Sequence, residues 1–337
     1  MNSTNLDDPE VQAIAQRLAS IDPEVRRIAV TDLGDLADEA HTFLLVAALR
    51  DEEPAVRAAA ALALETMENQ EAIEGLAQAL DDPDAPVREA AAHSLAEVKE
   101  PASAAWLLPL ASSGPARVRA AVLRALRELR VPVSAEPALA ALQEARPARD
   151  TADTIALRRE AIGVLGYLKH AAAVPVLAGL AASDPIDEVR RAAVGAMAFA
   201  TGDAGACDAL EAALQDPSWQ VREEAATALG KLQQPAVAGA LLQALDDPYW
   251  QVRLRAARSL GRLRSVASVS ALVGALGHAI SNLRKEAALA LGEIGDAAAV
   301  PSLQVAASDP DPEVRKSARL AISQIVQIAR IGSPSGT

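Results

Sequence analysis

The sequence predicts an all-α protein, an α-solenoid (superhelix) of about ten two-helix repeats with a period of 31 to 32 residues. Three observations support this fold class. The motif Asp-Pro-x-x-x-Val-Arg recurs along the 337 residues, its arginines are almost evenly spaced, and the segments around it have the apolar periodicity of helices. A fixed period of this size is typical of stacked repeats, in which each unit contacts only its neighbours.

The most regular feature is an arginine that follows valine or leucine. Successive members are separated by 31, 31, 31, 39, 32, 32, 31, 31 and 31 residues. In chain order they are Arg26, Arg57, Arg88, Arg119, Arg158, Arg190, Arg222, Arg253, Arg284 and Arg315. An aspartate stands about six residues before many of them, and the arginine recurs in acidic and basic repeats alike. We therefore interpret the series as ion pairs and hydrogen bonds between repeats, made by the planar guanidinium, rather than as a basic binding stripe.

Each repeat is expected to contain two antiparallel helices. In the third repeat, residues 71–80 have apolar side chains at helical spacing, and Asp-Asp-Pro at 81–83 ends this first helix. Asp84 is expected to cap the second helix and Pro86 to lie in its first turn, where a missing N–H costs nothing. The buried positions expected in the second helix are Val87, Ala91, Leu95 and Val98.

These motifs resemble the HEAT-like repeat family, in the short bacterial form known from phycobilisome (PBS) lyases. The resemblance is carried by the Asp-Pro and Val-Arg pairs and by Ala-x-x-x-Leu-Gly, as in AATALGKL (225–232) and AALALGEI (287–294), and it covers roughly residues 9–330. It implies that the second helix of each pair lines a concave surface. For function it implies either a scaffold or adaptor protein or a bilin lyase.

The repeat spacing and the charge divide the chain into four segments. Residues 1–130 are expected to form acidic N-terminal repeats, 131–154 an irregular insertion, 155–330 the C-terminal repeats and 331–337 a disordered tail. The insertion accounts for the 39-residue interval. It is either a tolerated loop or a hinge or recognition loop.

Composition argues against several classes of function. The net charge is −13, and residues 1–100 hold 22 acidic but only 7 basic residues, which opposes binding to nucleic acid or to an anionic membrane. The one cysteine, Cys207, excludes an internal disulfide and a cysteine-based zinc site. With neither a signal peptide nor a long apolar run, we expect a cytoplasmic protein that does not enter the membrane.

No catalytic constellation is visible in the sequence. HEAT-repeat deoxyhypusine hydroxylases bind two irons through paired His-Glu motifs, and none of the four histidines here is followed by glutamate. We therefore expect no metal and no cofactor. Whether the protein is an enzyme stays open, with a non-enzymatic role favoured.

The strongest candidate for a binding site lies between Pro248 and Lys285, a stretch without an acidic residue. Counted from Val252, Arg255, Arg258 and Arg262 fall at +3, +6 and +10, on one stripe of the predicted second helix. Aromatic residues and further members of the same face complete the predicted partner-binding set: Trp219, Tyr249, Trp250, Arg255, Arg258, Arg262, Lys231, Tyr167 and Phe199. Tryptophan and arginine are common in binding hot spots, whereas a solvated helix face is the alternative.

The leading hypothesis is a non-enzymatic scaffold or adaptor that binds a protein partner carrying acidic, carboxylate or phosphate groups. A bilin lyase-like or tetrapyrrole-handling chaperone is the first alternative, because arginine would hold the propionates and aromatic rings would stack on the pyrroles. Nucleic-acid binding in a basic concave channel is the second alternative and is opposed by the charge. The partner, the oligomeric state and a natural or designed origin stay open.

Overall fold

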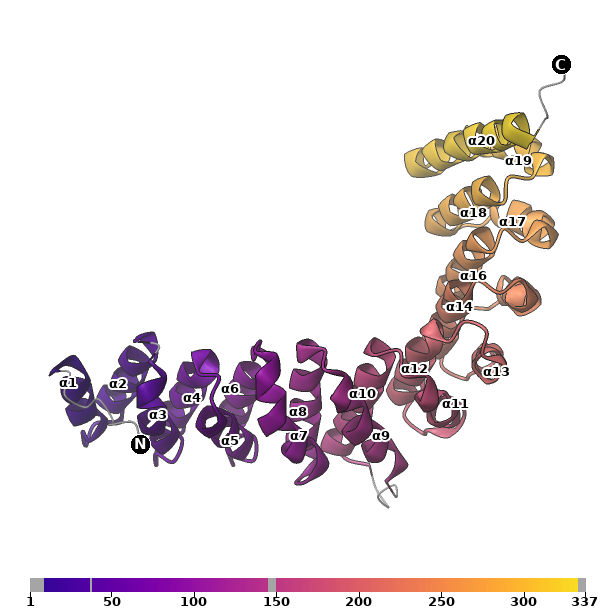
Figure 1. Ribbon diagram of the computed structural model, residues 1–337. Helices are drawn as coiled ribbons and strands as arrows, with labels where there is room; N and C mark the ends of the chain where they lie inside the picture. Colours follow the sequence, from indigo (N-terminus) through magenta and orange to yellow (C-terminus); the bar gives the residue numbers. More distant parts are fainter. Residues whose placement is uncertain (1–8, 37, 145–149, 333–337) are drawn as a thin grey trace. The chain divides into compact units, whose positions relative to one another are not determined.

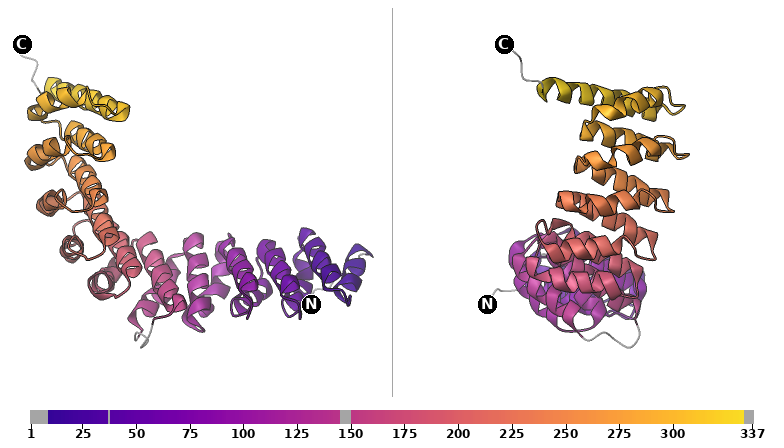
Figure 2. Two further views of the ribbon diagram at one scale, coloured as in Figure 1. Left: turned by 180° about the vertical axis from the view of Figure 1, so that it is seen from behind. Right: turned by 90° about the vertical axis from the view of Figure 1, so that its right-hand side faces the viewer.

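A computed structural model describes residues 9–36, 38–144 and 150–332. Within these ranges the chain is a succession of α-helices linked by short turns and 3₁₀ segments, without a β-strand (Figures 1 and 2). The helices in the described ranges form ten consecutive pairs, which confirms the all-α solenoid of about ten two-helix repeats. The chain divides after Leu168 into two compact units.

The first unit contains five helix pairs. Its helices are α1 (Pro9–Leu18), α2 (Pro23–Asp35), α3 (Thr42–Ala48), α4 (Pro54–Ala63), α5 (Gln70–Ala79), α6 (Ala85–Ala96), α7 (Ala104–Ser112), α8 (Ala116–Leu129), α9 (Ala135–Gln143) and α10 (Ala152–Tyr167). Its 3₁₀ segments are η1 (Glu39–His41), η2 (Leu64–Thr66), η3 (Pro101–Ser103) and η4 (Pro132–Ser134).

The second unit also contains five helix pairs. Its helices are α11 (Val174–Ser183), α12 (Asp187–Ala196), α13 (Ala204–Ala213), α14 (Trp219–Leu232), α15 (Ala238–Ala244), α16 (Trp250–Arg262), α17 (Val269–Ala275), α18 (Ser281–Ile294), α19 (Val300–Ala306) and α20 (Pro312–Gly332). Its 3₁₀ segments are η5 (Ala171–Ala173), η6 (Met197–Phe199), η7 (Pro235–Val237), η8 (Val266–Ser268) and η9 (Ala297–Ala299).

The helices of each unit lie in two layers, one of even-numbered and one of odd-numbered helices. In the second unit α14, α16, α18 and α20 pack in sequence, and the odd-numbered helices lie beside them (Figure 1). The core between the layers consists mainly of Ala, Leu and Val. The predicted core positions of the third repeat are buried: Val87, Ala91, Leu95 and Val98.

The start of α6 departs from the prediction in one respect. Asp84 occupies the N-cap position, but its side chain makes no hydrogen bond to the helix. Its carboxylate instead accepts from Nη2 of Arg57, 2.7 Å away in the preceding repeat. The predicted side-chain cap is wrong here because an arginine with five donors offers this carboxylate a charged partner.

The arginines predicted to join repeats form a ladder along the loops, as expected. Arg57 donates from Nε and Nη2 to the carboxylate of Asp82, at 2.7 and 3.0 Å. Its Nη1 donates to two main-chain oxygens of its own loop. Asp82 also accepts the main-chain N–H of Asp84, so this carboxylate shapes its own loop and binds the neighbouring repeat. Equivalent pairs are Arg26–Asp51, Arg190–Asp216, Arg222–Asp247 and Arg284–Asp309.

Within the described ranges, five of the ten arginines depart from this arrangement: Arg88, Arg119, Arg158, Arg253 and Arg315. Arg88 and Arg253 make no hydrogen bond to a carboxylate within the described ranges. The carboxylate partner usually lies 25 residues after the arginine, and at this position Arg88 has Ser113 and Arg253 has His278. Each of these repeats therefore lacks the acidic side chain that would complete the ladder.

Glycines allow the even-numbered helices to approach closely. A Cβ added at Gly230 would lie 2.1 Å from Oγ of Ser259 and 3.0 Å from its Cα. Gly261 and Gly292 follow at intervals of 31 residues and face Ala290 and Ala321 in the same way. The close spacing of α14, α16, α18 and α20 therefore depends on these positions having no side chain.

The predicted insertion at 131–154 is not irregular throughout. Residues 135–143 form α9, which is the first helix of the fifth repeat, and α10 begins at Ala152. The added length therefore falls between these helices, where 145–149 lie outside the described residues. At the other end of the chain, α20 extends to Gly332, and 333–337, the rest of the predicted tail, are likewise outside the described residues.

Acid should weaken the ladder. Hydrogen bonds from Arg26, Arg119 and Arg284 lower the pKa values of their carboxylate partners, which are Asp51, Glu144 and Asp309. A carboxylate with a lowered pKa in the folded state stabilises the fold above its unfolded pKa of about 4, and this contribution is lost as the pH falls further. We expect the urea midpoint of unfolding to be nearly constant from neutral pH to about pH 5 and to drop below it.

The control for this prediction is Asp309→Asn, which removes one of the titrating groups. Its midpoint should be lower than that of the wild type at neutral pH, and the difference should shrink at acidic pH. A constant difference between the two proteins across the pH range would contradict the assignment of the acid sensitivity to the ladder.

Candidate binding surface on the even-numbered helices

The predicted arginine stripe lies on the exposed side of α16. We call the exposed sides of α14, α16 and α18 the even-helix face. Val252, Ala256 and Leu260 are buried against the core, and Arg255, Arg258 and Arg262 lie on the opposite side of the helix. The stripe inferred from helical spacing is therefore confirmed as a geometric feature.

Acidic residues of the adjacent helices pair with two of these arginines. Nε of Arg255 lies 2.9 Å from Oε1 of Glu223 in α14. Arg258 donates from Nε and Nη2 to both carboxylate oxygens of Glu286 in α18, at 2.7 and 2.8 Å. The middle of the even-helix face is therefore a network of paired charges and not the uncompensated basic patch that the acid-free stretch suggested.

The aromatic residues gather at the amino-terminal ends of α14 and α16. The rings of Trp219 and Tyr249 are stacked, with centroids 5.6 Å apart and an angle of 11° between the planes. The guanidinium of Arg222 lies over the Tyr249 ring, 5.6 Å from its centroid, in a cation–π arrangement. Trp250, the first residue of α16, is half-buried. Tyr249 is 45% exposed, so this stack forms part of the surface.

The aromatic stack and the end of the arginine stripe are too far apart to form one hot spot. Trp250 and Arg262 are the first and last residues of α16, and twelve residues of helix span roughly 18 Å. The structure therefore divides the predicted cluster into an amino-terminal aromatic site, a paired middle and a basic carboxyl-terminal end.

At the carboxyl-terminal end of α16, Arg262 lines an open groove. The groove has a volume of about 510 Å³ and lies along the ends of α16, α18 and α20. We call it the carboxyl-end groove, and its polar lining residues are Gln233, Arg262, Arg264, Glu293, Gln324 and Gln327. Both arginines are exposed. Lys231, which is also exposed, occupies in α14 the position that Arg262 has in α16, 31 residues later.

One carboxylate opposes these bases. Partial burial raises the pKa of Glu293, the charge of Glu286 raises it further, and Arg262 acts in the opposite direction. Because a raised pKa means that this carboxyl takes up a proton at a higher pH than an ordinary glutamate, mild acidification makes the groove more positive.

Arg264 was not among the predicted residues. It follows α16 with a φ of 50°, in the left-handed region that usually favours glycine. Its main-chain N–H donates to the carbonyl of Gly261, which closes the helix end. Gln233 and Gly295, one repeat before and one repeat after, have the same left-handed conformation. Aligning the repeats would therefore have placed Arg264 at the end of the helix, beside the predicted Arg262.

The last two predicted residues have other environments. In the first unit, Tyr167 is 47% exposed, and the guanidinium of Arg130 lies 5.5 Å from its ring centroid. Phe199 lies in η6 and packs against the buried Val174, Ala200 and Ala206. Phe199 therefore contributes to packing, while Tyr167 offers an exposed ring.

The remaining features that could carry chemistry are Cys207 and the possible metal ligands among the described residues. Burial and the nearby Glu211, Asp208 and Asp203 raise the pKa of the Cys207 thiol, which keeps it protonated. Across the described residues, no three His, Cys, Asp or Glu side chains are placed to hold a metal ion. None of the described helices combines the length and the apolar character needed to cross a membrane.

Comparisons with known proteins identify the type of repeat. The family model described as HEAT repeats matches residues 11–96, 73–157, 148–230, 184–247 and 238–323. No curated protein sequence matches the chain. An engineered protein of known structure is 23% identical over 94% of this chain and 99% of its own, with a TM-score of 0.51.

Solved structures of importin beta and of Kap121p have similar folds. Importin beta is 18% identical over 94% of this chain, with a TM-score of 0.60, and Kap121p bound to Nup53p is 15% identical over 95%, with a TM-score of 0.64. The chain spans 50% and 42% of these two proteins. At this level of identity the likeness concerns the fold alone.

Proposed function

The chain belongs to the HEAT-repeat family, and from this premise we propose that it is a non-enzymatic scaffold or adaptor that binds an acidic protein partner in the carboxyl-end groove. The bilin lyase-like and nucleic-acid-binding alternatives, the PBS-lyase subtype and the cytoplasmic location stay predictions. The pairing of Arg255 and Arg258 with glutamates takes support away from a basic nucleic-acid channel.

The observation that carries the proposal is the open groove lined by two exposed arginines. Neither Arg262 nor Arg264 forms a side-chain ion pair among the described residues, in contrast to Arg255 and Arg258. The N–H groups of their guanidinium groups are therefore available to a partner. A planar guanidinium binds a carboxylate or a phosphate group best, because it can donate two parallel hydrogen bonds to either. Lys231 extends the positive charge toward α14.

The rigidity of the stack favours binding of a protein. The groove is formed by the ends of packed helices, so the backbone that carries its arginines is held in place before a partner arrives. Less conformational entropy is then lost on binding than with a mobile loop. Kap121p, which has a similar fold, has been crystallised bound to a protein, Nup53p.

The test compares two double charge reversals. Arg262→Glu with Arg264→Glu reverses the groove, while Arg50→Glu with Lys99→Glu makes the same change in net charge at exposed sites of the first unit. Partners captured by the wild type from a lysate of the source cell would be identified by mass spectrometry, purified and titrated against all three proteins. We expect the groove variant to bind at least about tenfold more weakly, equivalent to about 1.4 kcal/mol, and the control to bind as the wild type does.

Equal affinity in the two variants would reject the groove as the binding site, provided that circular dichroism shows both to be folded. Loss of binding in both would indicate a response to net charge alone. A visible absorbance change on adding a tetrapyrrole, or DNA binding with a steep salt dependence, would instead support one of the two alternatives.

A further inference from the structure

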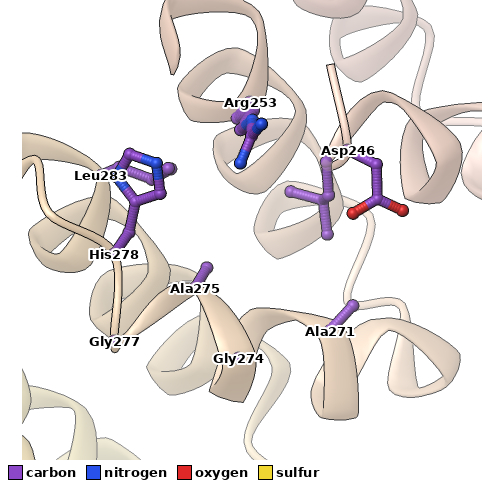
Figure 3. A pocket seen from close by; sticks show the side chains of 9 residues that line it. Asp246, Arg253, Ala271, Gly274, Ala275, Gly277, His278 and Leu283 are labelled. Carbon is purple, nitrogen blue, oxygen red and sulfur yellow. The ribbon is translucent and has the colours of Figure 1, made fainter. Parts of the chain in front are cut away.

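A second cavity lies beside the ladder arginine that lacks a carboxylate. It has a volume of about 510 Å³ and lies between α15, α16, α17 and the loop before α18. Arg253 and His278 both line it, and Figure 3 shows Arg253 between His278 and Asp246, with Ala271, Gly274 and Ala275 of α17 on the other side. The opposite wall consists of small residues, so the cavity is open next to the guanidinium.

His278 stands where the ladder has an aspartate. In the neighbouring repeats, the side chains of Asp247 and Asp309 accept the main-chain N–H two residues later, each at 2.8 Å. Nδ1 of His278 accepts from the N–H of Ile280 in the same way, at 3.1 Å. The histidine thus reproduces the loop-shaping role of the aspartate but supplies no negative charge to Arg253.

The orientation of Arg253 leaves its two terminal nitrogens available. Its Nε donates to the main-chain oxygen of Asp247, and neither Nη group has a hydrogen-bond acceptor among the described residues. Arg119 shows what this orientation can bind: its Nε donates to the carbonyl of Ala111, and Nη1 and Nη2 hold the carboxylate of Glu144 at 2.8 and 2.6 Å. Arg253 has the same orientation, but no carboxylate of the described residues accepts from its Nη1 and Nη2 groups.

A further donor lies on the same cavity. Because Nδ1 of His278 accepts a hydrogen bond, the proton of the neutral imidazole is on Nε2, for which the described part of the chain provides no acceptor. A carboxylate in the cavity would therefore find the two Nη groups of Arg253 and the Nε2–H of His278. Asp246 on the far side disfavours a dianion such as phosphate.

We propose that this cavity is a carboxylate-binding site, in which an Asp or Glu side chain of a protein partner completes the missing position of the ladder with Arg253. The assignment of the carboxylate to a protein partner rests on the proposed scaffold function. The carboxylate site itself does not, since it lies near the amino-terminal ends of α16 and α18 and shares no lining residue with the carboxyl-end groove.

The test uses small probes and the side-chain Nε–Hε NMR signals of the arginines in the full-length protein. The signal of Arg253 would be assigned from its loss in Arg253→Lys. The probes are N-acetyl-glutamate N-methylamide, which carries a side-chain carboxylate, N-acetylglycine, which carries a chain-terminal one, and inorganic phosphate. We expect the first probe to shift the Arg253 signal in a saturable manner and to leave the signals of Arg222 and Arg284 unchanged, because their carboxylate partners are already present.

Two substitutions of one residue provide the decisive comparison. His278→Asp supplies the missing carboxylate, so probe binding should weaken about tenfold or more, and the urea midpoint should rise as the ladder closes. His278→Asn can still accept the N–H of Ile280 but adds no charge, so binding should persist. Binding that is unchanged in His278→Asp, or no saturable shift in the wild type, would overturn the proposal.

The remaining outcomes are also informative. A shift with N-acetylglycine alone would assign the site to a chain terminus and overturn the side-chain assignment. A shift with phosphate alone would overturn the carboxylate assignment. If the probe binds Arg253 but the groove variant Arg262→Glu with Arg264→Glu still binds its partner normally, the cavity is supported and only the proposed groove fails.

Discussion

Replacing Arg57 by methionine should lower the free energy of unfolding by roughly 3 kcal/mol, because the change leaves buried acceptors without their donor. Arg57 is 9% exposed and donates to Asp82, Asp84 and two main-chain oxygens. Methionine keeps much of the apolar stem, so the loss reflects the missing guanidinium and not a cavity. Urea unfolding followed by circular dichroism would measure it.

Arg88→Met is the matched control for this prediction. Arg88 occupies the next ladder position and, among the described residues, donates only to the carbonyl oxygens of Asp82 and Pro83. Its replacement leaves no carboxylate without a donor, so the expected loss in the free energy of unfolding is about half that of Arg57→Met or less. Equal losses would show that the carboxylate pairing contributes little and that the main-chain hydrogen bonds account for the stabilisation.

Gly261→Ala should also destabilise the protein, by about 2 kcal/mol, although alanine is the better helix former. The added Cβ would lie 2.8 Å from Cα of Ala290 and from an oxygen of Glu293. Since the nearest atom at Ala290 is main chain, α16 and α18 would have to separate. The same urea experiment measures the effect.

Gly179→Ala makes the identical chemical change where there is room for it. Gly179 lies in α11, and a Cβ there would meet nothing within 4 Å. This variant should gain up to about 1 kcal/mol from helix propensity alone. A gain at Gly261 as well would mean that the even-numbered helices are free to move apart, against the close packing described above.

The fold was predictable because its stabilising interactions recur with the period of the sequence. The repeats bury equivalent apolar positions, and in most of the described repeats an arginine binds a carboxylate about 25 residues later, so the repeated motif already specifies the contact. The exception at Asp84 shows the limit of that method. A local cap was expected there, but the carboxylate is bound by Arg57 from the preceding repeat.

The binding surface was less predictable, because charges far apart in the sequence meet across the layer. The stretch without acidic residues, 248–285, is bounded by Glu286, and Glu223 lies 32 residues before Arg255. Arg255 and Arg258 are distant in sequence from these glutamates, so a local count of charges does not pair them. An alignment of the repeats at 31 residues places each arginine and its glutamate on adjacent helices. The same alignment would have shown that His278 replaces an aspartate, which the arginine spacing alone does not show.

The short reach of the ladder has a consequence for how the protein forms. A pair such as Arg57 and Asp82 closes a loop of only 25 residues, and the even-numbered helices that pack together belong to consecutive repeats. Local contacts of this kind speed folding, and a stack of repeats can nucleate at any adjacent pair. During synthesis, two repeats outside the ribosome already contain everything needed for one complete interface, so the nascent chain can fold by successive addition at its growing end.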